Sequence, residues 1–245
     1  MQIKLLIFVI TIVILLYLRA CIINMENLHI QIDISSELYS KNPESSELGR
    51  KIISESIALI NELGFEDFTF KKLGEHINSP ESSIYRYFKS KHILLIYLTS
   101  WYWTWTEYRL VFATTNISSP EERLRKSINI LTNPDLANSS SSFVDNELLS
   151  KIIFNESLKA YHTKSVDLEN KKGYFKAYKS VVKRVGDIIL EIDPAFEFSH
   201  MLVSTVIEGA HQQKYFAAHL PSLTDCIKDK NAISEFYQKL VFNFL

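Results

Sequence analysis

Basic and hydroxyl side chains gather in one short stretch of the chain, between Ser82 and Lys91. Hydroxyl groups can bond phosphates or base edges, and an arginine can form two hydrogen bonds to a guanine. Arg86, Lys89 and Lys91 lie close together, and no acidic residue occurs from Ser82 to Thr106. Because the whole chain has a formal net charge of -1, any contact with a polyanion depends on such a local patch. The residue types in this stretch therefore suit contact with nucleic acid.

The elements around this stretch are predicted to be helices. Apolar residues recur at helical spacing over residues 45–63, and Gly64 then follows where a left-handed backbone would end the helix. Thr69 is a good N-cap for a second, shorter helix over residues 69–77. A further short helix follows a tight turn, so the spacing predicts a helix-turn-helix unit behind a longer supporting helix.

The second short helix is predicted over residues 81–88, with Ser79 as its cap and Pro80 as its first helical residue. Ile84 and Phe88 are four residues apart and would both face inward. The remaining side chains are left near the outer surface: Ser82, Ser83, Tyr85, Arg86 and Tyr87. Spacing alone leaves two interpretations open, a DNA-binding unit or a compact three-helix core with a solvated basic corner.

A family resemblance favours the first interpretation. The stretch GFEDFTFKKLGEHINSPESSIYRYFKSKHILL resembles the DNA-binding signature of the TetR/AcrR family of repressors, and the Y-x-Y-F-x-x-K pattern from Tyr85 to Lys91 is its most specific part. The chain departs from that signature at Gly74, where the family usually has Ala. It departs again at the turn, where Asn78 stands in place of a Gly; Asn tolerates the left-handed backbone that this turn needs.

The resemblance implies a role for each residue of the site. Tyr85 and Lys91 would hold phosphates, while Thr69 and Lys71 would grip the flanking DNA backbone. Four side chains would face the major groove: Ser82, Ser83, Arg86 and Tyr87. The expected partners are a palindromic double-stranded DNA operator and a second copy of this chain, since one short recognition helix reads too few bases alone.

Composition and periodicity predict an all-α chain, because only 6 Gly and 6 Pro interrupt its 245 residues. The expected architecture is an N-terminal three-helix helix-turn-helix DNA-binding domain followed by a larger α-helical regulatory and dimerisation domain. The predicted divisions are an apolar segment at 1–24, an N-terminal extension at 25–44, the DNA-binding domain at 45–92 and the regulatory domain at 93–245.

Further helices are predicted at 143–162, 172–192, 194–219 and 230–244, the third one opened by Asp193 and Pro194. In similar proteins, two C-terminal helices pair across a two-fold axis. The last two helices are the candidates here, and the alternative is that their apolar residues fill the monomer core. The residues in question are Met201, Leu202, Val206, Ile207, Tyr215, Phe216, Phe236, Leu240, Val241 and Phe244.

The regulatory domain would bind an unknown small-molecule effector, because the helix after the DNA-binding unit links ligand to DNA affinity in similar proteins. Trp101, Trp105 and Tyr108 lie on that helix, among five aromatic residues in a short span. An aromatic pocket for an apolar ligand is one interpretation, and ordinary core packing is the other.

Enzyme chemistry finds little support in the sequence. It contains no phosphate-binding loop, dinucleotide glycine fingerprint, nucleophile elbow or HExxH motif, so we expect neither an enzyme nor a cofactor. Its two cysteines, Cys21 and Cys226, are not part of a Cys/His cluster at metal spacing, so we expect no metal site.

The N-terminus admits more than one interpretation. Residues 5–18 are apolar between Lys4 and Arg19, as in a signal peptide or a short membrane anchor, whereas Met25 would make a normal start for a cytoplasmic protein. We expect a cytoplasmic regulator, with anchoring in the inner membrane by residues 1–24 as the alternative. A competing function is a helical adaptor of the same fold that does not bind DNA, tethered by that segment.

Overall fold

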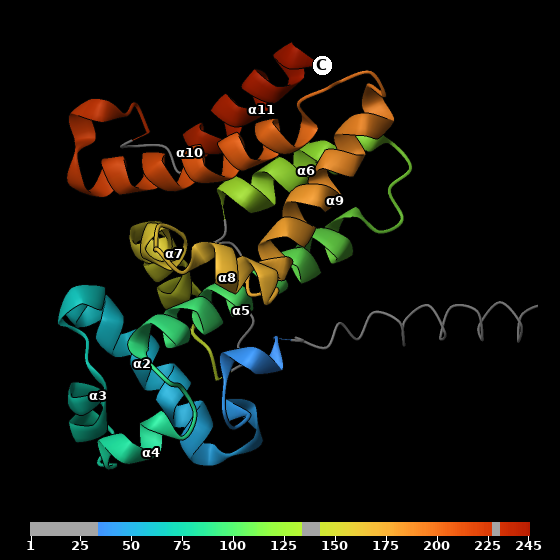
Figure 1. The fold of residues 1–245 in the computed structure, drawn as a ribbon. Helices are drawn as coiled ribbons and strands as arrows, with labels where there is room; N and C mark the ends of the chain where they lie inside the picture. The colour runs from blue at the N-terminus through green and yellow to red at the C-terminus, as the bar shows by residue number, and fades with distance from the viewer. Residues whose placement is uncertain (1–33, 134–142, 227–230) are drawn as a thin grey trace, which may run out of the picture. The chain divides into compact units, whose positions relative to one another are not determined.

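Helices make up every regular element that the structure describes, as the sequence predicts (Figure 1). The structure is a computed structural model that describes residues 34–133, 143–226 and 231–245. The apolar segment at 1–24, and with it the question of a membrane anchor, lies outside these residues. Within them, no helix is long and apolar enough to cross a membrane.

The N-terminal helices match the predicted helix-turn-helix unit. Two short 3-10 turns, Ser36–Leu38 and Pro43–Ser45, precede the supporting helix α2 (Glu47–Asp67). Helix α3 (Phe70–His76) and helix α4 (Glu81–Tyr85) follow it. The hydroxyl of Thr69 accepts a hydrogen bond from the Lys72 amide, so the predicted cap of α3 is confirmed.

Helix α2 kinks at Gly64 and continues for one more turn. Gly64 has a φ of 78°, as expected for a glycine in this place, but its ψ of 158° is extended and not that of a left-handed helix. The chain then closes a turn in which the Phe68 amide donates to the Gly64 carbonyl. The buried Phe65 lies in this last turn and anchors it against the core.

Seven more helices follow among the described residues. Ser90 caps α5 by accepting from the Ile93 amide, and Ser119 caps α6 by accepting from the Glu122 amide. The helices are α5 (Lys91–Thr114), α6 (Pro120–Thr132), α7 (Asn146–Tyr161), α8 (Val166–Lys171), α9 (Lys176–Ile192), α10 (Ser199–His219) and α11 (Ala232–Phe244). A 3-10 turn, Pro221–Leu223, separates the last two helices.

Helix α5 is the central element of the fold. It packs against α6, α7 and α9, while α2 packs against α3 and α7 (Figure 1). The part of α5 from Leu94 to Thr104 is buried along its whole length. Helices α6, α9, α10 and α11 close a second, aliphatic core. Residues 33–245 cluster as one compact unit, and the division at residue 92 stays a prediction.

Two predicted roles of a proline as the first residue of a helix are wrong. Helix α4 begins at Glu81, and Pro80 is its cap residue with an extended ψ of 139° and no side-chain cap from Ser79. Helix α10 begins at Ser199 and not at Pro194. Asp193 instead closes a local turn, in which its side chain accepts from the Ala195 amide.

Gly74 lies where the turn between α3 and α4 passes closest to α3. A Cβ atom at this position would come within 2.7 Å of the Ser79 carbonyl oxygen, and the Ser79 amide donates to the Gly74 carbonyl. Asn78 provides the sharp turn with a φ of 53°. The Gly that replaces the family's usual Ala therefore has a physical reason, because this turn leaves no room for a methyl group.

Lys91 fastens the start of α5 to the end of α2. Its ammonium group donates to the carbonyls of Phe65 (2.9 Å), Glu66 (2.9 Å) and Phe68 (3.2 Å). These are carbonyls at the C-terminal end of a helix, where the negative end of the dipole attracts a cation. All three donors of the ammonium group are used in this way.

We expect Gly74→Ala to destabilise the protein by about 1–3 kcal/mol, because the added methyl group overlaps backbone atoms that cannot rotate away. The same substitution in an unobstructed helix raises the free energy of unfolding by about 1 kcal/mol. The sign of the change therefore shows whether the added methyl group is obstructed. Gly186→Ala on α9 is the matched control, since there the nearest atom, at 2.8 Å, belongs to the exposed side chain of His200. Urea unfolding measures both, and a stabilised Gly74→Ala variant would contradict the close approach.

We expect Lys91→Met to lower the free energy of unfolding by about 1–2 kcal/mol, because three carbonyls lose a charged donor. Lys89→Met is the control: Lys89 is exposed two residues earlier, and the change should stay within about 0.5 kcal/mol. Equal effects of the two substitutions in urea unfolding would show that the carbonyl contacts of Lys91 add nothing.

Candidate nucleic-acid interface

Helix α4 presents a polar surface on a firmly anchored base. Ile84 and Phe88 are fully buried, as predicted; α4 packs against α3, and the Phe88 ring lies 5.2 Å from the Tyr97 ring of α5. Ser82 and Arg86 are exposed and Ser83 is half-buried. Arg86 makes no ion pair with any residue that the structure describes, so its guanidinium group is available to a ligand.

Tyr85 lies where the resemblance places a phosphate contact. Its side chain is 50% exposed, and its ring packs edge-on against Phe70 of α3 with the centroids 5.1 Å apart. The ring contact limits the directions in which the hydroxyl group can point. Tyr85 is therefore a pre-oriented hydrogen-bonding group beside α4.

Thr69 and Lys71 mark the start of α3, and both side chains are exposed. Because the Thr69 oxygen accepts the capping hydrogen bond, its hydroxyl proton remains available to a phosphate. Lys71 forms no ion pair within the described part of the chain. It lines an open hollow along the α3–α4 turn together with Gly74, Glu75, Asn78, Ser79, Pro80 and Glu81.

Tyr87 is not on the outer surface, and its predicted role in the major groove is wrong. The residue is only 2% exposed, and its hydroxyl lies 2.9 Å from the Ser46 hydroxyl at the cap of α2. This hydrogen bond, followed by the nearby Lys41, lowers the pKa of Tyr87. The cause of the misplacement is that α4 ends at Tyr85, so helical spacing no longer applies two residues later.

Lys91 has a structural role inside the domain, and its predicted contact with a phosphate stays a prediction. Its three hydrogen bonds to the end of α2 use every donor that the resemblance assigned to DNA. The ammonium group also lies 4.9 Å from the centre of the Phe65 ring. The most specific part of the sequence motif therefore divides into an exposed half, with Tyr85 and Arg86, and a structural half, with Tyr87 and Lys91.

Lys41 is a basic residue near this surface that the sequence interpretation did not include. It is exposed in the N-terminal extension, and its ammonium group lies 5.1 Å from the centre of the Tyr87 ring. The Ser40 amide donates to the Tyr87 carbonyl and holds the extension there. The polar sequence around Lys41 carries no periodic signal, so only the structure brings it beside the motif.

The three residues proposed for an effector pocket stack in a row along α5, and their role in binding an effector stays a prediction. Trp101 stacks on Trp105 at 6.2 Å, Trp105 on Tyr108 at 5.3 Å, and Tyr108 on the exposed Phe112 at 6.5 Å. Trp101 is buried, and the row runs outward from it. Successive turns of one helix accommodate these rings because each ring packs on the next.

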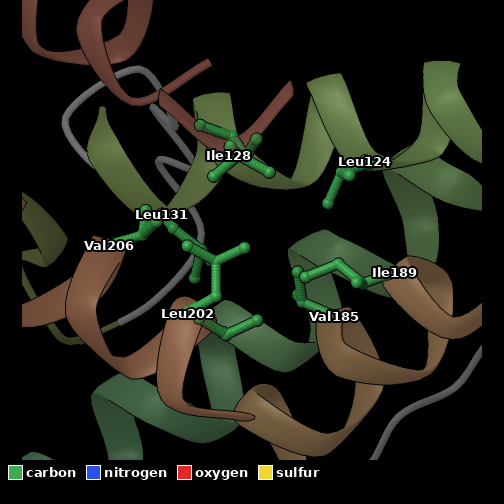
Figure 2. Close-up of a pocket in the computed structure, with 9 residues that line it drawn as sticks. Leu124, Ile128, Leu131, Val185, Ile189, Leu202 and Val206 are labelled. Atoms are coloured by element: carbon green, nitrogen blue, oxygen red, sulfur yellow. The ribbon is translucent and has the colours of Figure 1, made fainter. Parts of the chain in front are cut away.

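A small cavity does lie in the C-terminal part, but aliphatic residues line it. Figure 2 shows side chains from α6, α9 and α10 around it. Its volume is about 10 Å³, room for roughly one water molecule, whereas ligand sites usually measure hundreds of Å³. Its full lining is Leu124, Ile128, Leu131, Val185, Ile189, Leu202, Val203, Val206 and Val241.

Comparisons with known proteins identify the N-terminal domain. Residues 52–98 match the family model described as "Bacterial regulatory proteins, tetR family". Among solved structures, the crystal structure of AibR in complex with isovaleryl coenzyme A and operator DNA is similar at 14% sequence identity, with a TM-score of 0.48. That similarity covers 79% of this chain and 98% of AibR. No curated protein matches the sequence.

The family model spans most of α2, all of α3 and α4, and the start of α5. These are the elements that carry the motif from Thr69 to Lys91, so the match and the geometry concern the same domain. The resemblance found in the sequence is thereby confirmed for this domain: residues 52–98 match the tetR family of bacterial regulatory proteins.

Proposed function

We propose that this protein is a sequence-specific, DNA-binding transcriptional regulator of the repressor type that acts as a homodimer. The observation that carries this proposal is helix α4, whose exposed Ser82, Tyr85 and Arg86 stand on the buried anchors Ile84 and Phe88. A short polar helix on a rigid apolar base is what insertion into the major groove requires.

The exposed groups divide into two kinds of DNA contact. Arg86 and Ser82 would read base edges, because a guanidinium group can bond two acceptors of one guanine. Thr69, Lys71 and Tyr85 would hold phosphates on either side of the groove, and such contacts position a protein without reading sequence. Lys91 and Tyr87 would support these contacts from inside the domain.

Helices α10 and α11 would supply the dimer interface. Their buried apolar residues, among them Leu202 and Val241, fill the monomer core, as the alternative interpretation of the sequence had it. Four of the predicted interface residues remain exposed instead: Met201 (65%), Tyr215 (37%), Phe236 (56%) and Phe244 (61%). Exposed side chains of this size on adjacent helices are suited to contact with a second copy.

Regulation by an effector would act through α5, which is joined to both parts of the protein. Lys91 ties its first turn to α2, and the neighbouring His92 lies 2.8 Å from the Glu169 carboxylate of α8. The later turns of α5 pack against α6, α7 and α9. A change of packing in the C-terminal part would therefore move the element that fixes the DNA-binding helices.

Selection from a random DNA pool by the purified protein tests the proposal directly. We expect enrichment of a palindrome with half-sites about one helical turn apart. Binding should weaken steeply with salt, because phosphate contacts release counterions. No enrichment and no salt dependence would instead favour the adaptor alternative, a protein of this fold without DNA binding.

We expect Arg86→Ala and Lys71→Ala to weaken operator binding in different ways. Loss of a base contact at Arg86 should cost about 1–3 kcal/mol on the selected sequence and relax preference at one base pair. Loss of Lys71 should weaken binding to all sequences and lower the salt slope by about one. Titrations of selected and scrambled DNA at several salt concentrations measure both effects.

Lys126→Ala is the matched control for these two variants. It removes the same charge from α6, where Lys126 pairs with Glu122 on the exposed face. DNA affinity should not change. If Lys126→Ala weakened binding as much as Lys71→Ala did, overall charge and not the α3–α4 surface would account for the affinity.

We expect Met201→Glu combined with Phe236→Glu to convert the protein to a monomer, because charges cannot be buried at an apolar interface without partners. Operator binding should fall with it, since each monomer reads only half of the palindrome. Phe112→Glu is the control, because Phe112 on α5 is equally exposed (65%) and lies outside the proposed interface. Analytical ultracentrifugation decides the question, and a double variant that remains dimeric would exclude this interface.

A further inference from the structure

His211 of α10 is a polar side chain buried in an aromatic environment. Only 4% of it is exposed, and neither ring nitrogen has a hydrogen-bond partner among the described residues. A buried donor or acceptor left unpaired lowers the stability of the fold by about 1–3 kcal/mol, so an apolar residue of similar size would make the fold more stable here. Packing by itself therefore does not explain why a histidine stands at this position.

Rings from α5 and α7 pack around this imidazole, and a ring from α9 packs behind one of them. Phe154 of α7 lies 4.6 Å from it between ring centroids, and Trp103 and Tyr102 of α5 lie at 6.0 Å and 6.5 Å. The ring of Tyr178 of α9 stacks on the Trp103 ring, with the two ring centroids 4.3 Å apart. We call these five residues the His211 cluster.

The other polar groups at the His211 cluster have partners of their own. The Trp103 indole donates to the Tyr161 hydroxyl at 2.9 Å, and the Tyr178 hydroxyl donates to the Glu208 carboxylate at 2.7 Å. The two nitrogens of His211 are therefore the groups that remain for an incoming molecule.

The imidazole is uncharged at neutral pH. Burial, and then the nearby Lys214, lower the pKa of His211 to about 3. A neutral imidazole offers one donor and one acceptor nitrogen, and a hydroxyl group of a ligand can pair with one of them, by accepting from the N–H or by donating to the bare nitrogen. A cationic ligand would lack a free counter-charge here, because the Glu208 carboxylate already accepts from the Tyr178 hydroxyl.

We propose that the His211 cluster is the effector site, and that it takes a flat, uncharged aromatic molecule whose hydroxyl group bonds the His211 imidazole. This inference rests on the proposed function, because it gives the regulator its ligand class and moves the site away from the Trp101–Tyr108 row. The rings fill the space between α5, α7, α9 and α10, so a ligand enters by displacing them. That displacement acts on Tyr102 and Trp103 and hence on α5.

The test compares two probes, 2-naphthol and naphthalene, which share a ring system and differ by one hydroxyl group. Calorimetric titration of the purified protein, without DNA, should show 2-naphthol binding about tenfold tighter, the effect of one neutral hydrogen bond. In His211→Leu the two probes should bind equally, with naphthalene retained. In His200→Leu, which changes an exposed histidine of the same helix, the tenfold difference should persist.

Several results would overturn the inference: no binding of either probe to the unmodified protein, no difference between the probes, or a difference that survives in His211→Leu. Thermal unfolding gives a second readout. His211→Leu or His211→Phe should keep or raise the Tm, because unpaired nitrogens leave a buried site. A fall in both variants would mean that the imidazole already has an internal partner. Since no DNA is present, these outcomes are independent of the operator selection.

Discussion

The contact between the Lys91 ammonium group and the end of α2 is the constraint on which the DNA-binding domain depends. Helix α2 turns sharply at Gly64, so the carbonyls of its last turn lack the donors that a continuing helix would provide. Lys91 supplies those donors, and because it is the first residue of α5, the same contact fixes where α5 begins. Helices α3 and α4 lie in the chain between these two fixed points, which limits how α4 can be presented.

This constraint also explains why one motif contains residues with opposite roles. Tyr85 belongs to the last helical turn and points its ring past Phe70 toward solvent. After it the chain tightens, with the Tyr87 amide donating to the Ile84 carbonyl three residues back, and Tyr87 turns inward to Ser46. The motif therefore combines exposed side chains, which we propose contact DNA, with side chains that make contacts inside the domain.

The aromatic residues of α5 show a similar division around the helix. Trp101 and Trp105 stack along one side and continue to the exposed Phe112, whereas Trp103 faces Tyr178 and His211. The aliphatic core among α6, α9, α10 and α11 is by contrast nearly closed. Polar groups that could recognise a small molecule therefore meet on the Trp103 side of α5, and the same helix carries Lys91 at its start.

The sequence by itself determined the all-α class, the helix-turn-helix unit, the cap at Thr69 and the inward anchors Ile84 and Phe88. These features depend on residues a few positions apart, where spacing and capping chemistry are sufficient. Only the tertiary structure decided the roles of Gly74, Tyr87, Lys91 and His211. Each of these depends on a partner from another element, such as a turn carbonyl, a helix cap, a helix end or a ring cluster. Local periodicity contains no information about contacts of that kind, because they arise only when distant segments pack together.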